Sequence, residues 1–188
     1  VFFSKKIFEN YWFETGTPTF LVDLLMERGV FTPVLDQTIA SEDLLSAFDV
    51  DTMRVEALLF QTGYLTVDTV EDMVGSRYFH LTYPNREVYQ SLNICLAAGF
   101  MGDAGRENSF RVALYRKLQA NDFSALESHF KALFASIPFD WHRKNDIARY
   151  EGYYASVFYS HFAALGLDIR VEDATSRGRV DMTVFFEG

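Results

Sequence analysis

The sequence has a single cysteine, Cys95, and this scarcity excludes two classes of protein. One thiol cannot form an internal disulfide framework, and it cannot build a zinc centre that needs several cysteines. A reduced compartment suits such a chain, so we expect a cytoplasmic protein. Cys95 stands between Ile94 and Leu96 in an apolar segment, which favours a core thiol over a reactive one.

Long hydrophobic runs are also missing. Charged residues interrupt the apolar stretches before these reach the ~20 residues needed to span a bilayer, so we expect no membrane partner. No basic-then-apolar signal peptide opens the sequence. The chain begins with Val1 and ends with a strand-like pattern over residues 184–188, and we therefore expect it to be a piece of a longer protein.

The sequence lacks the positive surplus that is typical of nucleic-acid-binding modules. It has 17 Lys and Arg against 26 Asp and Glu, a net charge of −9. Residues 36–72 hold nine acidic residues and one basic residue, Arg54. Because phosphate neutralisation supplies most of the affinity for nucleic acids, a local basic patch or bound metal ions would have to overcome this repulsion.

Several catalytic signatures are absent. There is no Gly-x-Ser-x-Gly elbow, no dinucleotide fingerprint and no phosphate-loop lysine, so we expect no ATP site in this chain. The four histidines, His80, His129, His142 and His161, lack the spacing of a helical metal motif. A packed core or rim position is the favoured interpretation of His161.

What the sequence does have is a high apolar content, 49%, arranged mostly with helical spacing. This content is enough for one medium domain or two small ones. We predict an interrupted helical opening over 1–29, helices over 41–48, 52–61, 87–100, 110–119, from 122 onward and over 145–165, a polar link over 102–109, and strands over 64–67, 77–81, 167–171 and 179–184.

The order of helix, helix and hairpin before residue 86 is typical of the later half of a winged helix. In that fold the second helix can read DNA. Here the second helix carries Asp51 and Glu56, which phosphates would repel. A structural or domain-packing role is therefore favoured.

The last helix, strand, turn and strand carry the sharpest local signal. Glu151 lies on the helix and Asp181 on the second strand. Metal-dependent nucleases need carboxylates that converge on Mg²⁺, and these two residues would supply part of such a site. Arg177 and Arg179 in the adjoining turn would meet a phosphate backbone. The alternative is that all four are ordinary surface charges, and on spacing alone this alternative is favoured.

Five stretches together resemble a bacterial family of AAA-ATPase-like proteins with a C-terminal PD-(D/E)XK nuclease-like domain. They are residues 11–21 (YWFETGTPTFL), 58–66 (LLFQTGYLT), 83–88 (YPNREV), 150–159 (YEGYYASVFY) and 178–181 (GRVD). The resemblance implies that the first stretch ends an ATPase module and that the last two begin a nuclease domain. It also implies a DNA substrate and a Mg²⁺ or Mn²⁺ cofactor.

The resemblance implies a role for each carboxylate. Glu151 matches the glutamate of the first core helix, which helps to organise the metal site, and Asp181 matches the strand aspartate that ligates the metal. The family's following strand ends in Glu-x-Lys, and no such motif follows Asp181 here. We therefore expect the chain by itself to be inactive, as part of an ATPase-linked nuclease. The alternative is a non-catalytic regulatory or interdomain binding module with a degenerate nuclease fold.

These observations predict a mainly α fold of the α+β class. Its expected ranges are the end of an ATPase-like module (1–30), a winged-helix-like block (31–86), a helical bundle (87–138) and the truncated α-β-β start of a PD-(D/E)XK nuclease-like domain (139–188). The last strand would present an apolar edge, Val184-Phe185-Phe186. Such edges pair readily with other strands, so we expect self-association there or burial against the helices.

Overall fold

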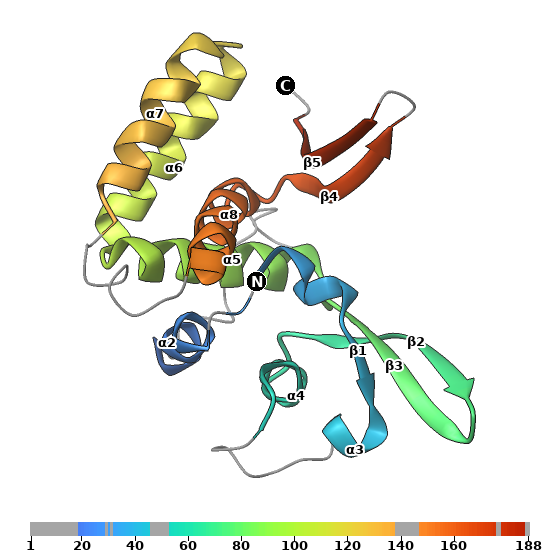
Figure 1. The fold of residues 1–188 in the computed structure, drawn as a ribbon. Helices are drawn as coiled ribbons and strands as arrows, with labels where there is room; N and C mark the ends of the chain where they lie inside the picture. The colour runs from blue at the N-terminus through green and yellow to red at the C-terminus, as the bar shows by residue number, and fades with distance from the viewer. Residues whose placement is uncertain are drawn as a thin grey trace, which may run out of the picture.

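A computed structural model describes residues 19–28, 30, 32–45, 53–137, 147–175 and 178–186 (Figure 1). The protein is mainly helical with two small antiparallel sheets, which confirms the predicted α+β class. The elements are α2 (Thr19–Glu27), η2 (Thr32–Gln37), β1 (Ile39–Ser41), α3 (Glu42–Leu45), α4 (Val55–Gln61), β2 (Thr66–Met73), β3 (Ser76–Thr82), α5 (Arg86–Met101), α6 (Ala104–Gln119), α7 (Ser124–Ala135), α8 (Ile147–Ala163), β4 (Asp168–Thr175) and β5 (Gly178–Phe185).

The first half of the chain builds a three-stranded sheet in the order β1-β3-β2. The predicted order of two helices followed by a hairpin is present, as α3, α4, β2 and β3. Neither β1 nor the short helix η2 was expected from the sequence. β1 is only three residues long and is held by antiparallel pairing with β3, a partner that lies far along the chain.

Two boundaries in this half differ from the prediction. α4 begins at Val55 instead of residue 52, because Arg54 before it has an extended backbone with ψ of 149°. Val55, Leu58 and Leu59 of this helix are buried. The strands run on to a turn of only two residues, Val74 and Gly75, which both have positive φ as in a type I′ hairpin.

The predicted polar link over 102–109 is wrong, because α6 already begins at Ala104. Gly102 ends α5 in the left-handed conformation with φ of 66°. The Asp103 carboxylate then accepts hydrogen bonds from the backbone N–H groups of Gly105 and Arg106, at 2.8 and 3.0 Å. This cap satisfies amides at the start of the helix, so α6 forms through a stretch of low apolar content.

α6 and α7 form an antiparallel helical hairpin that projects from the rest of the molecule (Figure 1). α7 begins at Ser124, two residues after the predicted start at Asp122, and the Asp122 carboxylate accepts a hydrogen bond from the Ala125 N–H at 3.2 Å. Phe123, just before α7, is 67% exposed. The inward face consists of buried Leu133 with the partly buried Phe130 and Phe134.

One hydrophobic cluster joins the elements. It includes Leu21 of α2, Leu59 of α4, Leu96 of α5, Leu133 of α7 and Val157 of α8. α5 packs against both α2 and α8. The cluster thus draws side chains from each of the four expected ranges, whose roles as separate domains stay a prediction. In the described residues, none of the helices has the length and apolar character needed to cross a bilayer.

Candidate active site

Helix α8 and the β4–β5 hairpin position the two predicted carboxylates. Glu151 lies near the start of α8, and Asp181 lies in the first half of β5. Gly166 allows the helix to turn into β4, with φ of +71°. A Cβ at this position would lie 3.1 Å from the side chain of Gln90, so both backbone conformation and space require glycine.

The β4–β5 hairpin has one charged and one apolar face, as alternation along a strand dictates. Asp181, Thr183 and Phe185 follow one another at steps of two, and Asp181 and Phe185 are exposed. Cross-strand pairing sets Arg170 opposite Thr183. The Arg170 guanidinium lies 4.8 Å from the centre of the Phe185 ring, a cation–π contact. Asp181 therefore shares its face with a positive side chain that the sequence analysis missed.

The other predicted site residues are placed only in part. Arg179 belongs to β5, where it pairs with Ala174 of β4. Arg177 lies outside the described residues. The convergence of Glu151 and Asp181 stays a prediction. Over the described ranges, no three His, Cys, Asp or Glu side chains gather closely enough to hold a metal ion.

The chemistry of Asp181 suits a hard divalent cation, although it is insufficient alone. Carboxylate oxygens are the ligands that Mg²⁺ prefers, and this carboxylate is open to solvent. One exposed carboxylate makes a weak site, because Mg²⁺ needs near-octahedral oxygen ligation. Further ligands are therefore needed beside Asp181.

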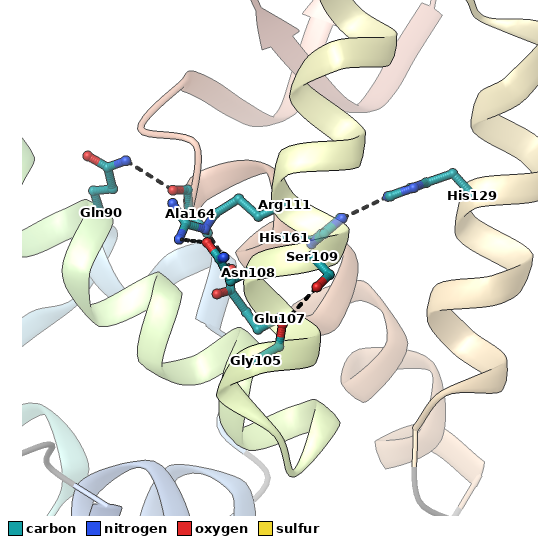
Figure 2. A network of polar contacts seen from close by, with 9 residues as sticks. All are labelled: Gln90, Gly105, Glu107, Asn108, Ser109, Arg111, His129, His161 and Ala164. Atoms are coloured by element: carbon teal, nitrogen blue, oxygen red, sulfur yellow. Dashed lines mark hydrogen bonds and ion pairs between the residues drawn. The ribbon is translucent and has the colours of Figure 1, made fainter.

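A buried histidine pair lies between α7 and α8 (Figure 2). The Nε2 atoms of His129 and His161 are 2.9 Å apart, and the two rings are within 20° of parallel. The ring centres are 5.2 Å apart, which exceeds the Nε2–Nε2 distance by about the width of one ring. The imidazoles therefore meet head to head through one N–H···N hydrogen bond.

The tautomers of this pair follow from what surrounds it. His161 Nδ1 is buried and has no hydrogen-bond partner among the described residues. We assign His161 Nε2–H as the donor to His129, because this choice leaves no buried N–H of His161 unsatisfied. Burial lowers the pKa of His129, and burial with His129 and Arg111 nearby lowers that of His161 to about 3. The pair is therefore neutral, and the core interpretation of His161 is confirmed.

An acidic side chain is also buried on α6 (Figure 2). Glu107 is 2% exposed and accepts a hydrogen bond from Arg111 Nε at 2.9 Å. Burial raises the pKa of Glu107, and Arg111 opposes that shift. The spacing of four residues was visible in the sequence, whereas the burial was not. The ion pair lies within α6, whereas the histidine pair joins α7 to α8.

Cys95 takes the expected place. Its side chain packs against the hydrophobic cluster, and burial raises the pKa of its thiol to about 11. A thiol with a raised pKa is a poor nucleophile. Cys95 is therefore a structural residue.

Comparison with known proteins bears on this last part of the chain. A model of the PD-(D/E)XK nuclease superfamily matches residues 149–187, which are α8, β4 and β5. The chain is 58% identical, over 186 residues, to an uncharacterised protein in the vnfD 5′ region of Azotobacter chroococcum mcd 1. That alignment covers 99% of this chain and 36% of the relative. The chain thus spans about a third of the length of the curated relative that it matches.

No solved structure matches the chain. The predicted resemblance of residues 150–181 to a nuclease domain is confirmed at the level of the superfamily. The C-terminal helix and hairpin, which carry Glu151 and Asp181, are therefore the part of this chain that is similar to the PD-(D/E)XK nuclease superfamily.

Proposed function

We propose that this chain belongs to a longer protein that hydrolyses phosphodiester bonds of DNA with a divalent metal ion. The observation that carries the proposal is the superfamily match over α8, β4 and β5, together with the exposed Asp181 on the charged face of β5. Because the chain spans about a third of its relative, the remaining ligands of the site would come from residues beyond it.

Each predicted residue has a distinct role in this proposal. Asp181 would ligate Mg²⁺ or Mn²⁺, and Glu151 would help to organise the site from α8. The bound ion would activate a water molecule and stabilise the charge that develops at phosphorus. Arg177 and Arg179 would hold the phosphate backbone beside Asp181, because Arg pairs well with phosphate oxygens. These cations offset the local repulsion that the net charge of −9 imposes on DNA.

The proposal includes two further parts of the longer protein. An AAA-ATPase-like module would precede this chain, in line with the resemblance of residues 11–21. The block from β1 to β3 would act as a winged-helix-like unit, which the sheet order β1-β3-β2 supports. Glu56 on α4 favours a packing role for that unit over reading DNA. Nucleotide binding by the full-length protein would test the ATPase part.

A second candidate is a non-catalytic binding or regulatory module with a degenerate nuclease fold. It is favoured by the absence, within the residues that the structure describes, of any cluster of three metal-ligating side chains. The acidic balance of the chain also favours it. The two candidates differ in whether Asp181 matters for bond cleavage.

The deciding experiment is cleavage of single- and double-stranded DNA by the full-length protein in Mg²⁺ or Mn²⁺. We expect Asp181→Asn to abolish metal-dependent cleavage, since it removes a carboxylate ligand but keeps the size of the side chain. The matched control is Asp72→Asn, an exposed carboxylate near the tip of the other hairpin. Equal cleavage by the Asp181→Asn variant and the wild type would favour the non-catalytic module.

A further inference from the structure

A cavity of about 740 Å³ lies where the first sheet, α5 and the β4–β5 hairpin come together. Its volume is in the range of small-ligand pockets, about 300–1,000 Å³. We call it the tyrosine cavity and define it by Tyr83, Arg86, Tyr89, Tyr159, Asp168 and Phe185, which are among its lining residues.

Aromatic side chains form much of the wall. The rings of Tyr83 and Tyr89 meet edge to face, with centres 5.1 Å apart. The Tyr89 hydroxyl donates to the backbone oxygen of Leu167 at 3.4 Å, which ties α5 to the turn before β4. Burial raises the pKa of Tyr89 to about 12, so its phenol is neutral at ordinary pH. Phe185 is 41% exposed on the hairpin side of the cavity.

Charged groups flank this aromatic wall. Arg86 is exposed, and its guanidinium forms no ion pair with any described residue. Arg170 lies next along the hairpin, stacked on Phe185. Two carboxylates, Asp36 and Asp168, also line the cavity. Burial raises the pKa of Asp36, and its charge in turn helps to raise the pKa values of Tyr83 and Tyr159.

The cavity and Asp181 lie along one face of the same strand. Phe185 and Asp181 are four residues apart on β5, which corresponds to about 14 Å at ~3.4 Å per residue. Side chains at even separations share a face, so Arg170 and Thr183 lie on the path between them. This distance is a few nucleotides along one strand of nucleic acid.

We propose that the tyrosine cavity binds one unpaired nucleotide of a nucleic-acid strand that runs along β5 toward Asp181. The base would stack on Phe185 and Tyr89, as bases stack on aromatic side chains in single-strand sites. Its phosphates would meet Arg86 and Arg170, and the cavity carboxylates would accept hydrogen bonds from base amino groups. The inference rests on the proposed function for its substrate class, nucleic acid. It adds that the bound strand is single and that the cavity is where one of its bases binds.

The test uses the full-length protein in EDTA, so that binding is measured without cleavage. The probe is a ten-nucleotide single strand with one central 2-aminopurine, whose fluorescence falls when it stacks on an aromatic ring. We expect Phe185→Ala to weaken binding about tenfold, since stacking on one aromatic residue contributes an affinity factor of this order, and to abolish the quenching. Phe185→Trp keeps the stacking surface and should restore both signals. The matched control is Phe123→Ala, another exposed phenylalanine, at the α6–α7 turn.

The phosphate contact is tested through salt dependence. Arg86→Gln should weaken binding and reduce the slope of log affinity against log salt by about one contact, whereas Arg77→Gln on β3 should change neither. Competition by a free mononucleotide would show that the base pocket alone suffices, and its failure with intact oligonucleotide binding would show that the strand is needed. Both outcomes support a nucleotide site.

Three results would overturn the inference: equal affinity of the Phe185→Ala variant, unchanged fluorescence on binding, or equal binding of the same sequence as a duplex. These outcomes are separable from failure of the proposed function. If Asp181→Asn abolishes cleavage while Phe185→Ala binds normally, the nuclease proposal stands without this cavity. If the Phe185→Ala variant no longer binds the single strand while the Asp181→Asn variant cleaves normally, the cavity binds a nucleotide but Asp181 is not a ligand of the catalytic metal.

Discussion

The β2–β3 hairpin gains a third strand, β1, whereas the β4–β5 hairpin has only two strands in the described part of the chain. In the first hairpin, Leu81 is buried and packs into the central hydrophobic cluster. In the second, the apolar face formed by Ile169, Met182 and Val184 is only half-buried. Two-stranded sheets are marginal in water, so the hairpin that carries Asp181 depends on support from outside itself.

The hairpin that is anchored in the core and the hairpin that carries the candidate site are therefore different ones. The better-supported hairpin has exposed, mostly polar strands toward its tip and anchors its base in the core. The less-supported hairpin carries the superfamily match, Asp181 and one wall of the tyrosine cavity. Sites placed on less stable elements can rearrange on binding, which agrees with a hairpin completed by ligand or by further chain.

The largest expected effect comes from truncating one apolar side chain in each hairpin. Leu81→Ala should destabilise the protein by about 2–5 kcal/mol, because it leaves a cavity in the core. Val184→Ala should cost about 1 kcal/mol or less, because that side chain is already half in water. Urea unfolding followed by circular dichroism measures both. Equal losses of unfolding free energy in the two variants would contradict the conclusion that the first hairpin is packed into the core more tightly than the second.

Acidification should weaken the helices behind the second hairpin. The pKa values of His129 and His161 are lowered in the folded protein, chiefly by burial. Between the unfolded value of about 6.5 and the folded values, the unfolded chain binds more protons, so stability is present above pH 6.5 and is lost as the pH falls. For His161 the loss should approach ~1.4 kcal/mol per pH unit below pH 6.5, and His129 adds to it in the same direction.

Urea midpoints between pH 8 and pH 5 would measure this loss. His161→Gln should flatten the pH dependence, because it removes one of the two buried imidazoles. His80→Gln is the matched control, since His80 lies on β3 of the other hairpin, where its half-exposed ring is 3.3 Å from the Glu71 carboxylate. A slope that survives His161→Gln unchanged would show that other groups cause the acid sensitivity.

Two glycines, one beside each hairpin, allow a finer comparison. Gly75 and Gly166 both have positive φ, so alanine would be strained at either position. A Cβ at Gly75 would meet nothing within 4 Å, whereas one at Gly166 would crowd Gln90 and Arg86. We expect Gly75→Ala to cost about 1 kcal/mol and Gly166→Ala about twice that. Thermal unfolding would measure both, and a smaller loss at Gly166 would show that Gln90 and Arg86 move aside freely.

The smallest expected effect concerns the edge of β5. In the described residues no strand pairs with the outer edge of β5, and this edge with exposed Phe185 should give weak, concentration-dependent self-association. Thr183→Lys should reduce it, because charged residues on an edge disfavour strand pairing. Sedimentation velocity over a range of concentrations measures the association. A protein that stays monomeric at high concentration would contradict the expectation.

Sequence patterns predicted the local elements better than their contacts. Helical spacing gave α5 and α8 to within two residues at each end, and alternation gave β4 and β5. The start of α6 was missed because its cap, Asp103, comes directly after the glycine that ends α5. β1 was missed because three residues carry no periodicity, and it exists through pairing with β3.

The sequence by itself determined the class of fold, the neutral core thiol and the positions of Glu151 and Asp181 on a helix and a strand, because these follow from periodicity and neighbouring residues. Only the tertiary structure decided that His129 meets His161 across 32 residues, that Glu107 is buried, and that three tyrosines and Phe185 line one cavity. The physical reason is that burial and long-range contact depend on how helices pack, which no local pattern encodes.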